Sequence, residues 1–138
     1  IALLIAHSLR ARLLEEQRSS NRAGLQKAIN VNAVITLAAN IDTVAWTTSK
    51  GYLPLEQSLN PALLPALPES IFVLHLFAEN DKVVKRSLFE SYLANNPSEE
   101  SIIYDGFDHT CCWNQIWHQT LKRVQKSQNS PLNPAVKE

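Results

Sequence analysis

A histidine on a short turn late in the chain has the surroundings that best suit acid–base chemistry. His109 lies within residues 105–113, between an apolar run and an amphipathic run, and Gly106 supplies a turn before it. A turn of this kind with a carboxylate nearby is a usual way to hold a general base. Asp81, in Glu79-Asn80-Asp81, follows the preceding apolar run. Asp81 and His109 are therefore the predicted acid and base.

In such a pair the carboxylate fixes the imidazole tautomer and stabilises the imidazolium that forms when the ring accepts a proton. A simpler interpretation is that Asp81 begins the following helix, as acids often do, but its position one strand before His109 favours the catalytic role. Asp42, after an earlier apolar run, is the competing acid. We also expect a substrate pocket lined by Asn40, Asp42, Trp46 and Tyr52.

The other histidines have plainer explanations. His7 lies in the opening helical run and His75 in an apolar strand, so both are expected to be packed or capped, and His118 lies on the last amphipathic run. Residues 108–112 together with His118 resemble a set of zinc ligands, but no second pair of ligands occurs elsewhere in the sequence. We therefore expect no metal site and no other cofactor.

A suitable nucleophile is missing from the sequence. Because the glycines are Gly24, Gly51 and Gly106, neither a Gly-x-Ser-x-Gly elbow nor a phosphate or dinucleotide loop can form. Cys111 is only two residues from His109, whereas a nucleophile normally comes from a separate element. Cys111 and Cys112 are adjacent and such neighbours rarely pair, so no disulfide framework is expected and the compartment stays open.

The composition is that of an ordinary globular domain. With 138 residues, 45% of them hydrophobic, the chain is long enough for one domain with a real core. The 13 basic and 13 acidic side chains balance, which gives no electrostatic reason to expect nucleic acid or an anionic membrane as a partner. No apolar run is long enough to span a bilayer. The apolar start at Ile1, without methionine, predicts the interior of a helix in the C-terminal part of a longer protein.

The order of elements predicts an α/β fold with a parallel sheet. Strands are expected at 31–39, 71–77 and 101–104, and helices at 1–18, 85–95 and 113–126, with a connector at 19–24. Strands that alternate with helices favour right-handed crossovers, and functional residues then follow the carboxyl ends of the strands.

Two stretches lie outside this alternation. Residues 40–70 contain four of the seven prolines, which predicts short helical turns in a cap-like or pocket-lining excursion. Residues 127–138 are polar with two prolines and are expected to form a loose tail after a domain that ends near residue 126.

The segments 37–47, 51–55 with 58–61, 79–84 and 106–113 resemble the C-terminal half of bacterial α/β-hydrolase-fold proteins, which are serine hydrolases of the esterase and lipase type. The resemblance extends to about residue 124. It implies that Asp81 is the triad acid and His109 the base. It also implies that residues 1–7 belong to the helix after the nucleophile elbow, so that the serine would precede Ile1. Ala78 departs from the pattern, since many hydrolases have glycine there.

We therefore expect the C-terminal part of an α/β-hydrolase, with about three parallel strands flanked by helices. The parent protein would hydrolyse an ester or similar acyl bond of a small molecule through an acyl-enzyme. The chain alone is expected to be inactive, because His109 has no serine to deprotonate. The alternative is a non-catalytic α/β interaction module in which the histidine turn is structural.

Overall fold

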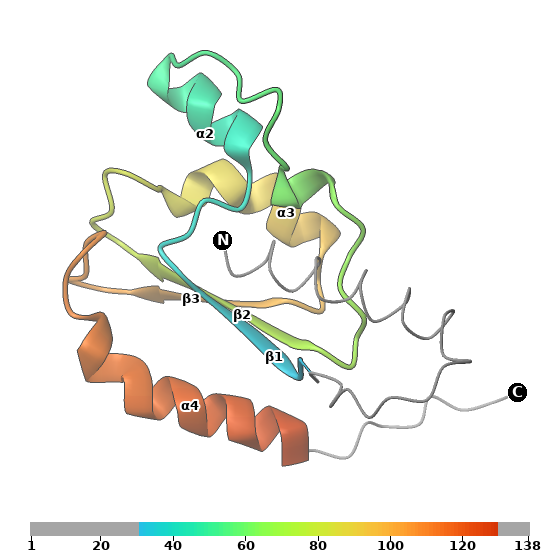
Figure 1. Cartoon of the computed structure of the whole chain (residues 1–138). Helices are drawn as coiled ribbons and strands as arrows, with labels where there is room; N and C mark the ends of the chain where they lie inside the picture. The colour runs from blue at the N-terminus through green and yellow to red at the C-terminus, as the bar shows by residue number, and fades with distance from the viewer. Residues whose placement is uncertain (1–30, 130–138) are drawn as a thin grey trace, which may run out of the picture.

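The computed structural model describes residues 31–129, and these form a parallel sheet with helices on both faces (Figure 1). The three strands are β1 (Ala33–Leu37), β2 (Phe72–Ala78) and β3 (Glu100–Tyr104), in the order β1-β2-β3. Both pairings are parallel. The mixed α/β class with three parallel strands, predicted from the sequence, is therefore confirmed.

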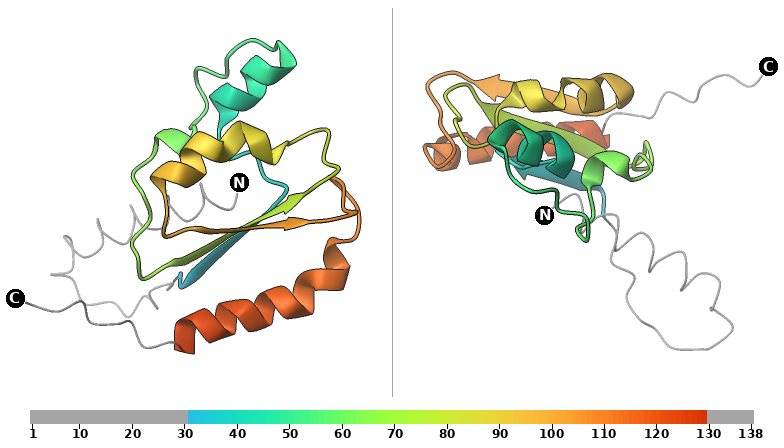
Figure 2. Two further views of the ribbon diagram at one scale, coloured as in Figure 1. Left: turned by 180° about the vertical axis from the view of Figure 1, so that it is seen from behind. Right: turned by 90° about the horizontal axis from the view of Figure 1, so that it is seen from above.

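Helices cover the two faces of the sheet unequally. The long helix α4 (Trp113–Asn129) lies along one face, while α2 (Thr43–Lys50) and α3 (Glu90–Asn95) lie on the other side, as the two opposite views show (Figures 1 and 2). Two short 3₁₀ turns, η1 (Pro61–Leu63) and η2 (Arg86–Phe89), complete the second layer. Strand β2 lies between two strands and two helical layers, so its side chains are buried along nearly its whole length.

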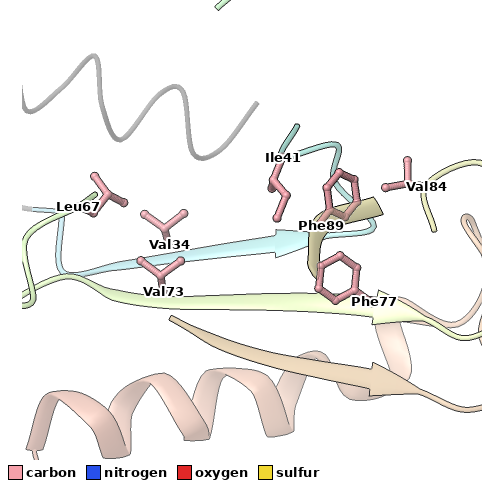
Figure 3. Packing of buried hydrophobic residues seen from close by; sticks show 7 residues of the cluster. All are labelled: Val34, Ile41, Leu67, Val73, Phe77, Val84 and Phe89. Carbon is pink, nitrogen blue, oxygen red and sulfur yellow. The ribbon is translucent and has the colours of Figure 1, made fainter. Parts of the chain in front are cut away.

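The period of two along β2 divides the core into two clusters. On the α2 and α3 side, Val73 and Phe77 pack with Val34 of β1, and the ring of Phe77 stacks on that of Phe89 at a centroid distance of 6.0 Å. Figure 3 shows this cluster, whose members are Val34, Ile41, Leu67, Val73, Phe77, Val84 and Phe89. On the opposite face, Leu74 and Leu76 pack against Ile116 of α4. The nearly unbroken apolar sequence of β2 is thus explained by burial on both faces.

The excursion between β1 and β2 is more ordered than a set of isolated turns. Asp42 caps α2, because its Oδ1 accepts hydrogen bonds from the backbone N–H groups of Val44 (3.0 Å) and Ala45 (3.1 Å). The same oxygen accepts a bond from Nδ2 of Asn60 (2.9 Å), which joins the start of α2 to η1. Gly51 ends α2 in the left-handed region, with φ of 65°.

Other boundaries differ modestly from the sequence expectation. The helix predicted over 85–95 is divided into η2 and α3, and the last helix continues to Asn129, three residues into the predicted tail. The predicted opening helix and connector, over 1–24, and the tail beyond residue 129 lie outside the described residues.

No helix within residues 31–129 is both long and apolar enough to cross a membrane.

Candidate functional site

The structure brings the predicted acid and base together. Asp81 follows β2 and His109 follows β3, and Nδ1 of His109 donates a hydrogen bond to Oδ2 of Asp81 at 2.9 Å. The carboxylate of Asp81 is completely buried, whereas the imidazole is 37% exposed. Oδ1 of Asp81 accepts two further bonds, from the backbone N–H groups of Val83 (2.7 Å) and Val84 (2.8 Å). The acid is therefore held rigidly while the ring reaches solvent.

Backbone hydrogen bonds join the two loops that carry this pair. The N–H of Glu79 donates to the carbonyl of Tyr104 at 3.0 Å, and that of Asn80 donates to the carbonyl of Phe107 at 2.9 Å. Both bonds extend the β2–β3 pairing past the ends of the strands. Neighbouring parallel strands end at the same edge of the sheet. These two backbone bonds therefore hold the loop that carries Asp81 against the turn that carries His109.

The histidine turn itself is organised by Asp108. Its Oδ1 accepts from the backbone N–H groups of Thr110 (2.8 Å) and Cys111 (2.7 Å) and from the hydroxyl of Thr110 (3.1 Å). The bond from the Thr110 N–H, followed by that from Cys111, lowers the pKa of Asp108 below its usual value. On the other side of the turn, Nε1 of Trp113 donates to the carbonyl of His109 at 3.3 Å.

Replacing Asp108 by alanine is expected to destabilise the fold in a pH-dependent way. Because the pKa of Asp108 is depressed in the folded state, its contribution is present above the unfolded pKa and is lost as pH falls through the lower folded value. Urea midpoints for Asp108→Ala should thus lie below those of the unaltered protein at pH 7 and converge with them below about pH 4. Glu56→Ala, at an exposed site, is the control. An equal deficit at both pH values would contradict this role.

A large cavity borders the free side of His109. Its volume is about 720 Å³, and its walls come from the end of β1, Trp46 of α2, the loop from Leu55 to Pro61, and Val83 and Val84 beside the acid. Because Nδ1 of His109 is bonded to Asp81, Nε2 is the ring nitrogen left for a reacting group. A cavity of this size, with few polar groups and a histidine at its edge, has the features of a small-molecule site.

The four residues predicted to line a pocket have different positions. Asn40 and Trp46 line the cavity, but Asp42 and Tyr52 are not among its lining residues. Asp42 is engaged as the cap of α2. Tyr52 is 59% exposed and packs edge-on against Trp46, with centroids 5.6 Å apart.

Two side chains tie α2 to the acid loop. Nε1 of Trp46 donates to the carbonyl of Val83 at 2.8 Å, and Nζ of Lys50 donates to that of Lys82 at 2.7 Å. The cavity wall and the acid are consequently parts of one hydrogen-bonded assembly.

The segment after His109 offers no metal cluster. Among residues 31–129, no group of three or more His, Cys, Asp or Glu side chains is placed to hold an ion. The two cysteines are adjacent with their sulfur atoms in contact, and Cys112 lies in the left-handed region at φ of 82°. His118, the distant member of the proposed zinc set, is exposed on α4.

A second histidine network lies inside the fold, where the sequence predicted only a packed or capped His75. The ring is completely buried; its Nε2 donates to Oε2 of Glu99 at 2.7 Å, and its Nδ1 shares a hydrogen bond of 2.8 Å with Oγ1 of Thr36. Burial, and then the nearby Glu99 carboxylate, raise the pKa of Tyr92, which also packs edge-on against His75. The pairing of Thr36 with His75 follows from the β1–β2 register, but no sequence pattern marks Glu99.

Comparison of the chain with protein-family models, with curated proteins and with solved structures finds no match. The resemblance to α/β-hydrolases therefore stays a prediction from the sequence, and the interpretation of the site depends on its geometry.

Proposed function

We propose that residues 31–129 carry the acid and histidine of a serine acyl-hydrolase site of the α/β-hydrolase type. The observation that supports this most directly is the Asp81–His109 pair, in which a buried carboxylate lies 2.9 Å from Nδ1 of a partly exposed imidazole. The ring borders a cavity of about 720 Å³ that is suited to an apolar ligand. The serine would come from sequence before Ile1, as the family resemblance implies.

In the proposed reaction, Asp81 keeps the proton of the neutral imidazole on Nδ1, so that Nε2 presents a lone pair. Nε2 accepts the proton of the serine hydroxyl as the serine oxygen bonds to the acyl carbon, and the imidazolium is stabilised by Asp81. The proton then passes to the departing alcohol oxygen, which leaves an acyl-enzyme. Water repeats the sequence: His109 accepts its proton, the acid product is released and the serine is restored.

The alternative is that the pair only fastens two loops of a non-catalytic interaction module. The loops are already joined by the backbone bonds from Glu79 to Tyr104 and from Asn80 to Phe107. A buried carboxylate with three hydrogen bonds, one of them to an exposed ring, is more than this fastening requires. These contacts favour the catalytic interpretation.

The tautomer of His109 tests the mechanism in the 138-residue chain itself. We expect nitrogen-15 NMR to show the proton of the neutral ring on Nδ1. In Asp81→Asn, the amide that replaces Oδ2 can donate to Nδ1, which should move the ring proton to Nε2. Asp105→Asn, in the same turn but bonded to Glu79, should leave the tautomer unchanged. A ring proton on Nε2 in the unaltered protein would contradict the mechanism, and loss of ester hydrolysis on removal of the ring is its functional counterpart.

A further inference from the structure

Asn40, one of the residues that line the cavity, has an unsatisfied polar atom. Its side chain lines the cavity, and its Oδ1 is buried without a hydrogen-bond partner among the residues that the structure describes. Nearly all buried carbonyl oxygens in folded proteins accept at least one hydrogen bond, because an unmatched one loses its bonds to water. Because Asn40 is a residue of the cavity wall, a rotation of its amide would let a ligand in the cavity supply the missing donor.

The backbone on both sides of Asn40 is fixed. Two residues before it, Ala38 lies in the left-handed region with φ of 43°, a strained conformation for a residue with a Cβ atom, and its N–H donates to the carbonyl of Leu76 at 2.9 Å. On the other side, Ile41 is buried in the core and Asp42 caps α2. Asn40 is therefore presented from a rigid turn, as expected of a residue that positions a ligand.

The rest of the cavity excludes a charged ligand. Among residues 31–129, no Asp, Glu, Lys or Arg lines the cavity, and His109 is the one ionisable residue that does. Aliphatic side chains, including Ile35, Leu55 and Val84, and the indole of Trp46 make up most of the wall. A charged group bound there would lose its hydration without gaining a counter-ion, whereas an uncharged aliphatic group would gain from burial.

We propose that Asn40 is a specificity-determining residue: the cavity holds an uncharged aliphatic acyl compound, and Oδ1 of Asn40 accepts a hydrogen bond from an N–H or O–H of that compound. The χ2 torsion of asparagine is soft, so a small rotation turns the oxygen toward such a donor. That the occupant is the acyl part of a substrate rests on the proposed function. That the bound compound is uncharged and carries a hydrogen-bond donor is inferred from the cavity alone.

Calorimetric titration of the 138-residue protein with four probes that share a six-carbon chain tests this assignment. Hexanamide is neutral with a donor, methyl hexanoate is neutral without one, and hexanoate and hexylammonium are charged. We expect hexanamide to bind most tightly and both ions at least tenfold more weakly. Asn40→Leu should weaken hexanamide about tenfold and leave methyl hexanoate unchanged, since one hydrogen bond is removed and the shape is kept.

Two further variants make the result specific. Asn40→Asp retains an acceptor of the same shape and should keep the preference for hexanamide over the ester. Asn95→Leu, at an exposed asparagine of α3, should change no affinity. Equal binding of hexanoate and hexanamide, or an equal loss of both neutral probes in Asn40→Leu, would overturn the assignment. Binding of the probes needs no nucleophile, so a failure of the binding test would not contradict the Asp81–His109 proposal. Equally, a failure of the tautomer experiment would not contradict the role of Asn40.

Discussion

Replacing His109 by alanine is expected to abolish ester hydrolysis in the longer serine hydrolase proposed above, with kcat falling by about 10⁴-fold or more. In the proposed mechanism the substitution removes the nitrogen that accepts the serine proton, but it leaves in place the bonds of Asp81 to Val83 and Val84 and the backbone bonds between the loops. Turnover of p-nitrophenyl butyrate at pH 7 to 8 measures the loss, and circular dichroism checks the fold. Substrate binding should change far less than kcat, because the cavity wall remains.

Two companion variants and the chain itself sharpen this experiment. Asp81→Asn should lower kcat by about 10⁴-fold, because the ring then holds its proton on the wrong nitrogen. His118→Ala, at an exposed histidine of α4, should keep full activity. The 138-residue chain should show no turnover. Activity that persists in His109→Ala would remove His109 from the mechanism, and His109-dependent activity in the chain alone would show that the nucleophile lies within it.

Replacing Glu99 by alanine is expected to lower the free energy of unfolding by about 3 kcal/mol, between the cost of one unmatched buried donor and that of a broken buried ion pair. The side chain of Glu99 is 5% exposed and accepts the proton of His75 Nε2 at 2.7 Å, and His75 is completely buried. Once the carboxylate is removed, Nε2 of the buried ring loses its hydrogen-bond partner. Urea denaturation at pH 7 measures the change.

The neighbouring glutamate is the matched control. Glu100 pairs with Arg123, but both side chains are about half exposed, so Glu100→Ala should change the free energy of unfolding by less than about 1 kcal/mol. The two substitutions remove the same atoms one residue apart and differ mainly in burial. Similar losses in both variants would show that burial of the His75 network is not what stabilises this part of the fold.

The fold was largely predictable because its central strand is buried on both faces. Residues 71–77 were expected as a strand from their unbroken apolar sequence, and β2 is Phe72–Ala78. The excursion was less accessible to prediction. Its order comes from Asp42 and Asn60, which are 18 residues apart, and a hydrogen bond between two polar side chains in a loop has no periodicity to reveal it.

The site was predictable to the extent that topology dictates it. Parallel strands end at one edge, so an acid after β2 and a histidine after β3 were expected to approach each other, and Asp81 and His109 do. The pocket residues were harder to assign, since Tyr52 is near Trp46 in sequence and in space yet lies outside the cavity. Glu99 was missed because its partner, His75, is 24 residues away in a buried strand.

The bonds from Trp46 to Val83 and from Lys50 to Lys82 have a consequence for how such a protein could be re-engineered. The cavity wall and the loop that holds Asp81 are joined by these two bonds, so in the proposed hydrolase a graft or insertion that shifts α2 is expected to shift Asp81 as well. New substrate ranges are therefore more accessible through exchange of side chains on a fixed wall, as at Asn40 or Leu55, than through replacement of the whole excursion.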